Sequence, residues 1–539
     1  MKKALLVALT LGLICAWAAP AMAVDWTAIG GFTVKNALYK NIDYRMPYGL
    51  GGVPGSDRLI GLTPATNSAK ILRSSLGAAD PAWNETNWWM QMRGDIFIIA
   101  RASADLYGVF GIEVNSYRFG DVDNPSIPYI GTGGVAATTA GRWNADAVGI
   151  AVKSMFIDFK VPSLPVWFRA GIQPYMLRPT VFLYVDAAGI TSRIKIDADP
   201  VLININPFWA KMYSGSSGYG IVSTSASYYT DYTTADDGNF FGVDINAVVG
   251  TIKPGVFFAM QRWNEYYIYA PAGPDFGRGD MQYWWVGPYV DATIGPVAIT
   301  ADFIYSGGED KWTQGTVVMS DTGSPNNTTL QATYSRKHSG FVTRGQVSYT
   351  MGKFVFGVGA LYGTGDNPGT RNKFEGWQIP YKSEAAKFNE DFLVLTGDFG
   401  LRQPYGTMNT GGLFKPWSSI GQGVWYVRGF ADYAVTDWLK LKFNAGYIGD
   451  TVHNGDEFGT DGVVSALGIA GQDLGGTGIG DDNSIGWELD TAVQINIYKN
   501  LYLDTAFGYL IAGKALAGQY NGWRAQDPWS LMTVLTYQF

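Results

Sequence analysis

The chain has 539 residues, a formal net charge of −7 at pH 7 and 69 glycines, and 15% of its residues are aromatic. Charged residues make up only 16% of the sequence, whereas a soluble domain has about 25%. The acidic balance argues against a nucleic-acid partner. Because Cys15 is the only cysteine, the chain has neither a disulfide nor a thiolate metal site.

The first 23 residues are typical of a secretory signal peptide. Lys2 and Lys3 precede an apolar stretch over residues 4–17, and Ala-Met-Ala comes directly before the expected cleavage point between Ala23 and Val24. Removal of the two lysines changes the formal charge from −7 to −9 (−7 minus 2). No later segment approaches about 18 consecutive apolar residues, which excludes a helical membrane protein. We expect residues 24–539 to form one domain.

Apolar and polar residues alternate in stretches along the whole remaining chain. In residues 90–101, Ile96 and Ile98 fall on one face of an extended chain, whereas Arg93 and Asp95 fall on the other. Such alternation predicts β-strands with one apolar and one polar face.

The connections between these stretches alternate as well, with tight turns on one side and long polar loops on the other. This asymmetry is typical of an up-and-down antiparallel transmembrane β-barrel with short periplasmic turns and long extracellular loops. We predict 18 strands, with 16 as the alternative, at residues 26–39, 88–102, 105–119, 145–160, 164–175, 200–212, 219–231, 239–249, 253–264, 281–294, 297–307, 340–351, 354–364, 424–436, 439–450, 484–498, 501–512 and 528–539. The stretch 390–402 also has a strand-like pattern, but it fits this order only if it lies inside a large loop.

The end of the chain has a specific pattern of its own. Leu535, Tyr537 and Phe539 fall on one face of the last strand, and the chain stops at an aromatic residue. This resembles the C-terminal signature by which the barrel-assembly machinery recognises proteins of the Gram-negative outer membrane. Together with the signal peptide and the alternation, the whole chain resembles a Gram-negative outer-membrane porin. The resemblance implies contact with outer-membrane lipid and, as is frequent among porins, a homotrimer.

Two short segments point further, to the 18-stranded alginate-export and substrate-specific porin group. Residues 169–173 read Arg-Ala-Gly-Ile-Gln, and residues 186–189 in the following loop read Asp-Ala-Ala-Gly. The group usually has Gly-Arg-Gln at the first segment, and this chain has Ile172 in place of that arginine. The subgroup and its substrate therefore stay open.

The predicted strand number has a direct consequence for the interior, because 16 to 18 strands enclose an aqueous channel. Strand-like alternation begins at Trp26, which leaves no room for an N-terminal plug domain, and no amphipathic helical stretch could supply a helical one. An inward-folded loop is the remaining way to narrow the channel. We predict passive diffusion of small polar solutes or ions.

The third long loop, expected at residues 176–199, is the candidate constriction. Residues 181–185 are apolar, and an apolar segment in a long loop is best buried inside the barrel. The alternative is an additional strand above the membrane. The charged residues of this candidate constriction are Arg178, Asp186, Arg193, Lys195, Asp197 and Asp199.

Charged side chains on the polar strand faces are expected to line the lumen and to set ion selectivity. For each of them, the alternative is an ordinary solvated side chain, and a preference for anions or cations stays open. The predicted lumen-lining residues are Arg93, Asp95, Arg169, Arg344, Arg428, Glu488 and Asp490.

Tryptophans near the strand ends predict two aromatic girdles at the membrane surfaces. Some of them could instead line a path for sugars inside the channel. The candidates are Trp26, Trp88, Trp89, Trp143, Trp284, Trp285, Trp425, Trp438, Trp487 and Trp529.

Other functions have less support. His338 and His453 are the only histidines, and both are expected in outer loops. Ser335 and Ser339 lie near His338 in the sequence, but no acidic residue is recognisable as the third member of a catalytic triad. We therefore expect no enzyme. An outer-membrane hydrolase stays an alternative, as does a barrel sleeve around a cytochrome in a porin–cytochrome electron conduit. We expect no cofactor. Acidic residues around 453–461 and 481–482 offer oxygen ligands for Ca²⁺, but their spacing does not match a helix-loop-helix calcium loop.

Overall fold

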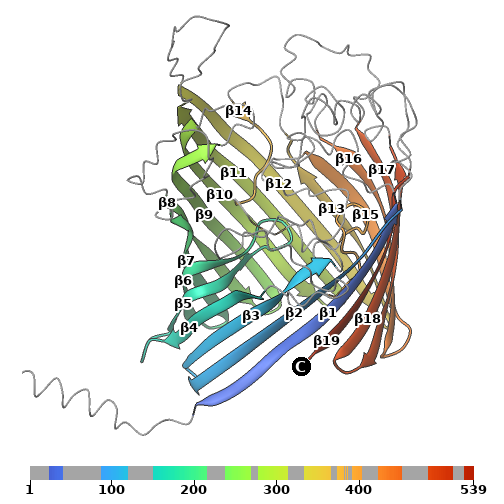
Figure 1. The fold of residues 1–539 in the computed structure, drawn as a ribbon, viewed down its shortest axis with the longest axis horizontal. Helices are drawn as coiled ribbons and strands as arrows, with labels where there is room; N and C mark the ends of the chain where they lie inside the picture. The colour runs from blue at the N-terminus through green and yellow to red at the C-terminus, as the bar shows by residue number, and fades with distance from the viewer. Residues whose placement is uncertain are drawn as a thin grey trace, which may run out of the picture.

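The strands form one antiparallel sheet that closes on itself, because β1 pairs with both β2 and β19 in this computed structural model (Figure 1). Consecutive strands are neighbours all the way around the barrel. The structure describes residues 24–40, 86–118, 150–214, 237–268, 277–313, 333–365, 373–380, 383, 385, 391–402, 423–451, 483–513 and 527–539.

Eighteen strands make up the wall, as predicted. They are β1 (Asp25–Lys40), β2 (Thr86–Ser103), β3 (Leu106–Arg118), β4 (Ile150–Lys160), β5 (Val166–Leu177), β6 (Leu183–Ala198), β7 (Val201–Ser214), β8 (Asp237–Val249), β9 (Ile252–Ile268), β10 (Gly277–Ile294), β11 (Val297–Thr313), β12 (Thr333–Met351), β13 (Phe354–Gly363), β15 (Val424–Ala434), β16 (Leu439–Asp450), β17 (Ser484–Tyr498), β18 (Leu501–Ala512) and β19 (Trp529–Gln538). The remaining strand, β14 (Lys373–Phe374), pairs in parallel with β12 and is too short to cross the wall. The described residues contain no helix with the length and apolar character needed to cross a membrane.

The distribution of polarity is the reverse of that in a soluble protein. On β4, the outward side chains of Met155 and Ile157 are 53% and 56% exposed, whereas the inward Asp158 is 1% exposed. The same holds around the barrel, where inward Lys35, Glu488 and other charged residues are buried. Closure of the sheet lets the first and last strands pair with each other, and an apolar outer surface suits contact with lipid.

The predicted aromatic girdles are only partly present in the structure. Trp26 and Trp438 at the rim with the short turns are exposed, as are Trp88 and Trp487 toward the opposite rim. Trp89 and Trp285 instead face the lumen and are buried. Successive side chains of a strand point to opposite faces, so in the pairs 88–89 and 284–285 only one tryptophan can reach the lipid. Trp143 lies outside the described residues.

The assignment of residues 176–199 to a loop was wrong. Residues 183–198 form β6, which pairs with β5 on one side and β7 on the other. Apolar and polar residues do alternate over residues 190–197, but the apolar and charged residues of this stretch also fit a loop inside the lumen, to which it was assigned. The strand expected at 219–231 lies outside the described residues, so the predicted number was right although one predicted segment differs.

The far end of the β5–β6 hairpin leaves the wall. Pairing of β5 with β4 stops at Ile172, and pairing of β6 with β7 begins at Ala188. We call residues 173–187 the inner hairpin, which reaches from the wall toward the middle of the barrel (Figure 1). Gly171 and Gly189 face each other where it departs. A Cβ on either glycine would lie 2.1 Å from a backbone oxygen of the neighbouring strand, so the departure point requires two glycines.

A second segment enters the lumen between β13 and β15. We call the described residues of 373–402 the inner segment. Its apolar side chains are buried although they belong to a long loop; Trp377, Phe392 and Leu395, for example, are at most 2% exposed. The strand-like stretch 390–402 does lie inside a large loop, as the strand order required, and the described part of it forms no strand.

Replacement of Gly171 by alanine should destabilise the barrel. Gly171 has a φ of +132°, and the added Cβ would meet the Met155 carbonyl oxygen. We expect a loss of about 2 kcal/mol in the free energy of unfolding, measured by urea titration of the protein folded into liposomes. Gly345→Ala is the matched control, because a Cβ there meets nothing within 4 Å. Equal stability of the two variants would contradict this account of the hairpin's departure.

Candidate pore constriction

The inner hairpin crosses the lumen and contacts the opposite wall at its tip. Arg178 forms ion pairs with Asp302 of β11 and, at 2.7 Å, with Asp291 of β10. Its guanidinium also lies 4.5 Å from the centre of the Tyr289 ring. Arg178 itself has a positive φ of 45°, so the turn presents this side chain in a conformation that the contacts must hold.

Aromatic packing holds residues 181–183, next to the tip of the inner hairpin, against β9 and β10. Phe182 stacks on Phe257 at 4.6 Å between ring centroids and meets Trp285 edge-on at 5.6 Å. Val181, Phe182 and Leu183 are at most 2% exposed. The apolar run thus has the buried environment that the sequence required, in the barrel interior.

The returning strand of the inner hairpin is held by a series of ion pairs that begins at Asp186. Asp186 belongs to the outward face by strand register, yet it pairs at 2.9 Å with the inward Lys153 of β4. Lys153 also contacts Glu113 at 3.2 Å, and Glu113 pairs at 2.8 Å with Arg93. An outward-facing residue can meet an inward-facing one only because the hairpin has turned into the lumen.

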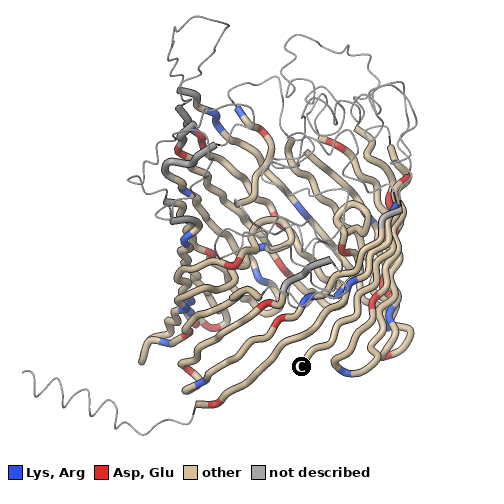
Figure 2. The backbone as a smooth tube through the Cα atoms, in the orientation of Figure 1, with Lys and Arg blue, Asp and Glu red and all other residues tan. Residues whose placement is uncertain are grey.

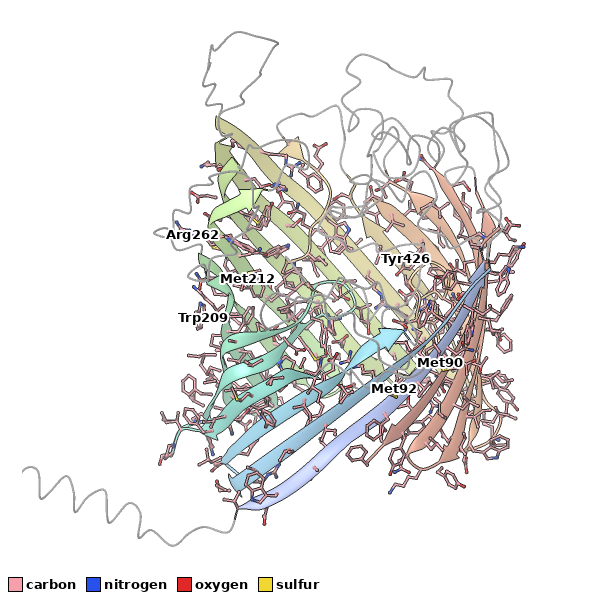
Figure 3. The ribbon with its side chains drawn as sticks, in the orientation of Figure 1. Met90, Met92, Trp209, Met212, Arg262 and Tyr426 are labelled. Carbon is pink, nitrogen blue, oxygen red and sulfur yellow. The ribbon has the colours of Figure 1, made fainter. Side chains whose placement is uncertain are left out.

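The inner segment is anchored at Asp391. Its carboxylate accepts hydrogen bonds from Arg344 at 2.9 Å, from Arg428 at 2.5 Å and from the Tyr426 hydroxyl at 2.5 Å. Tyr426, on β15, is labelled in Figure 3. Burial alone would raise the pKa of Asp391, but the Arg344 and Arg428 guanidiniums outweigh burial and lower it to about 2. The carboxylate is therefore charged at any physiological pH.

The inner segment then continues across the inner faces of β17, β1 and β18. Glu488 accepts hydrogen bonds from the backbone N–H groups of Val394 and Leu395 at 2.5 and 3.0 Å. Further along, Asp398 pairs with Lys35 at 3.5 Å, and Arg402 pairs with Asp504 at 2.5 Å. Wall residues of the lumen thus hold the segment by both its backbone and its side chains.

The two inward elements meet at Ser383. Its hydroxyl accepts a hydrogen bond from the Tyr184 N–H at 3.1 Å and donates one to the Phe182 carbonyl at 2.9 Å. Trp285 contacts both elements, because its indole N–H also donates to the Gln378 carbonyl at 2.8 Å. The two elements and Trp285 thus form one connected group inside the barrel.

Toward the short turns, the lumen carries exposed basic groups. Arg169 and Arg193 share Asp158 at 2.9 and 2.7 Å, and the Arg193 side chain is 45% exposed. Lys160 and Lys195 lie 5.2 and 5.3 Å from the Trp167 ring centroid. Charges of both signs are distributed around the wall (Figure 2), so the interior combines charged groups with the apolar cluster around Phe182 and Trp285.

The structure places the predicted residues as follows. Arg178 and Asp186 belong to the inner hairpin, whereas Arg193, Lys195 and Asp197 belong to the wall strand β6, and Asp199 starts its turn to β7. The loop origin assigned to the last four was therefore wrong. All the predicted lumen-lining residues lie on the inner face: Arg93, Asp95, Arg169, Arg344, Arg428, Glu488 and Asp490. That they set selectivity stays a prediction.

Sequence reasoning missed the partners of these residues. Glu113, Lys153, Asp391 and Arg402 were not singled out, although each anchors an inward element. The signal available for two of them was the strand-like stretch 390–402, whose alternation reflects burial inside the barrel.

His338 is also placed differently from the prediction. It lies in β12 and is 4% exposed, and it has an acid partner, because its Nε2 is 2.6 Å from Asp310. Ser335 and Ser339 face the other side of the strand, where they bond Glu309 and Tyr305. The serines that flank His338 in sequence therefore cannot act with it. His453 and the acidic residues near it lie outside the described residues, among which no metal-binding cluster of His, Cys, Asp and Glu occurs.

A closed barrel of 18 antiparallel strands with an apolar outside and charged residues inside is the architecture of a transmembrane β-barrel of the outer-membrane type. No protein-family model and no curated protein matches the chain.

Solved structures with a similar fold come from Pseudomonas aeruginosa. The outer membrane protein OpdK aligns with a TM-score of 0.45 and 10% identity over 95% of this chain and 98% of its own. OccK8 (OprE) aligns with a TM-score of 0.43 and 10% identity over 95% and 98%. OpdQ aligns with a TM-score of 0.42 and 8% identity over 96% and 98%. Similarities of this extent carry no functional information by themselves.

Substitution of Arg178 should widen the passage and shift its selectivity. Arg178→Ala removes charge-assisted hydrogen bonds worth about 1.5–3 kcal/mol each and leaves Asp291 and Asp302 without this cation. We expect a larger single-channel conductance and a reversal potential shifted toward cations in a salt gradient. Arg178→Lys keeps the charge but loses the fork geometry, so it should preserve the selectivity. An unchanged reversal potential in Arg178→Ala would show that Arg178 does not act on the passage.

The ion pair at Asp391 gives a defined pH dependence. Because the pKa of this carboxyl lies below its ordinary value, its contribution to docking is present at neutral pH and is lost only as the pH falls through about 2. Conductance should therefore be constant between about pH 7 and pH 4. Asp391→Asn leaves two buried guanidiniums without their carboxylate, at a cost of about 3 kcal/mol, and should give larger and noisier conductance steps at neutral pH. Identical traces for both proteins would contradict the anchoring role.

Proposed function

We propose that this chain is a passive diffusion channel for small polar solutes or ions across the outer membrane. The observation that supports this most is the polar, ion-paired lumen inside a barrel whose outer surface suits lipid. Lys35, Arg93 and Glu488 on the inner faces are buried and paired with protein groups, whereas the Arg193 side chain, 45% exposed, suits a hydrated path.

The passage is narrow and charged. The inner hairpin and the inner segment meet at Ser383, and ion pairs hold both to the wall. Solutes therefore pass close to fixed charges of both signs, which favours small polar molecules over apolar ones. A channel of this kind discriminates among solutes more strongly than an open 18-stranded barrel would.

Targeting and insertion belong to the same proposal. Leu535 and Tyr537 on β19 are outward and 39% and 41% exposed, which leaves them accessible to the barrel-assembly machinery before closure with β1. Residues 1–23 would be removed as a signal peptide, and a homotrimer in outer-membrane lipid would be the mature form.

Planar-bilayer recording of the purified, folded protein tests the proposal. We expect discrete conductance steps, and proteoliposomes should swell in small sugars or amino acids but not in larger oligosaccharides. Heat-modifiable migration in gels shows independently that the barrel is folded. Folded protein that never gives conductance steps would contradict the channel.

Two alternatives predict other results in the same preparation. A sleeve for a cytochrome would co-purify with a haem protein, visible as a Soret band, and the two inward elements leave little room for one. A hydrolase would cleave fluorogenic esters or peptides in a way that His338→Ala abolishes. Either result would replace the channel assignment.

A further inference from the structure

Two carboxyl groups of β17 hold the middle of the inner segment. Glu488 is 0% exposed and Asp490 is 5% exposed, and both point into the lumen because they lie two residues apart on one strand. The Glu488 carboxyl accepts the backbone N–H groups of Val394 and Leu395. The position of the inner segment therefore depends on the state of this carboxyl pair.

The two carboxyls are in hydrogen-bonding contact with each other. Ionised carboxylates can only accept hydrogen bonds, so a bond between two carboxyl groups requires a proton on one of them. Among the residues that the structure describes, no charged or amide group donates to the buried Oδ1 of Asp490. Two ionised carboxylates this close would repel each other. The contact between Glu488 and Asp490 therefore contains one proton.

The charges around the pair indicate the same proton. Asp391 of the inner segment lies between Arg344 of β12 and Arg428 of β15. If Glu488 and Asp490 were both ionised, three negative charges would face two positive ones in a largely buried site. An uncompensated buried charge is costly, and one proton on the carboxyl pair removes it.

The other groups near residues 391–402 do not supply the missing positive charge. Asn444 of β16 donates to Asp490 at 2.8 Å, and Tyr426 of β15 donates to Asp391, but both side chains are neutral. The further cations at this part of the inner segment have acids of their own, and these pairs are Lys35 with Asp398, Arg402 with Asp504 and Lys442 with Asp432.

We propose that this shared proton controls the position of the inner segment and thereby makes the channel sensitive to pH. With the proton, Glu488 and Asp490 can lie side by side and hold the segment against β17. Without it, two adjacent carboxylates must separate or take up water, and the N–H groups of Val394 and Leu395 lose their acceptor. The regulation rests on the proposed channel, whereas the presence of the proton does not.

The direction of the effect follows from proton linkage. The docked segment keeps one proton on the pair, whereas carboxyls that face water after release bind none at neutral pH. Docking is therefore strongest while the proton is present and weakens by up to about tenfold for each pH unit once it is lost. The conductance should rise at alkaline pH, and it stays constant on the acidic side because Asp391 remains charged there.

Infrared spectroscopy of the folded protein tests the proton. A difference spectrum at about pH 7 between the natural protein and Glu488→Gln should contain the carbonyl band of a protonated carboxylic acid, and at about pH 10 this band should be absent. Glutamine keeps an acceptor for a backbone N–H and a donor for Asp490. Glu309→Gln is the control, because Glu309 pairs with Lys311 at 3.0 Å and should give no such band. A spectrum without the band for Glu488→Gln would overturn the shared proton.

Single-channel conductance tests the regulation. From about pH 7 to about pH 10 the conductance of the natural protein and of Glu309→Gln should rise at least about twofold. Glu488→Gln should show equal conductance at both pH values, because its charges balance without a proton. Asp490→Asn balances the same charges and takes its place if Glu488→Gln fails to show heat-modifiable migration.

Two results would overturn the pH-dependent position of the inner segment. One is a natural protein whose conductance does not change at alkaline pH, and the other is an equal rise in Glu488→Gln. Folded protein that never conducts would instead contradict the proposed channel, and the infrared band would still decide whether the carboxyl pair holds a proton.

Discussion

Every feature of this protein depends on one constraint, which is that a backbone amide cannot stay unpaired in hydrocarbon. The strands satisfy this constraint because the sheet closes through the pairing of β1 with β19. Closure with 18 strands would leave a wide interior. Side chains that face this interior can be charged, whereas those that face the lipid must be apolar. The inverted distribution of polarity, with Lys35 buried and Ile157 exposed, follows from closure.

The two inward elements reduce the wide interior by different means. The inner hairpin is a continuation of β5 and β6, so its direction is set by backbone pairing and by the glycines at 171 and 189. The inner segment has almost no regular pairing and depends on side chains of the wall, with Asp391 between Arg344 and Arg428 as its strongest contact. The inner hairpin is therefore held mainly by its own backbone pairing, whereas the position of the inner segment depends on individual charged side chains of the wall.

Much of the fold could be predicted from the sequence, because a strand that separates lipid from water must alternate with a period of two. The alternation gave the strand number and the faces of Arg93 and Glu488. It could not show that 183–198 is a wall strand, since apolar and charged residues there also fit a loop buried in the lumen. His338 was missed because β12 extends seven residues before its predicted start at 340, to Thr333. The partners of the lumen charges come from segments hundreds of residues apart, such as Lys35 and Asp398, and no local pattern reports such a contact.

The most direct test of the central claim is the conductance of a barrel without its inner segment. Residues 374–402 would be replaced by a short Gly-Ser linker, and correct folding would be checked by heat-modifiable migration. If the inner segment narrows a closed, hydrated barrel, the single-channel conductance should rise several-fold and discrimination between sugars of different size should weaken. A folded variant with the same conductance as the natural protein would contradict the account, because the passage would then lie elsewhere or not exist.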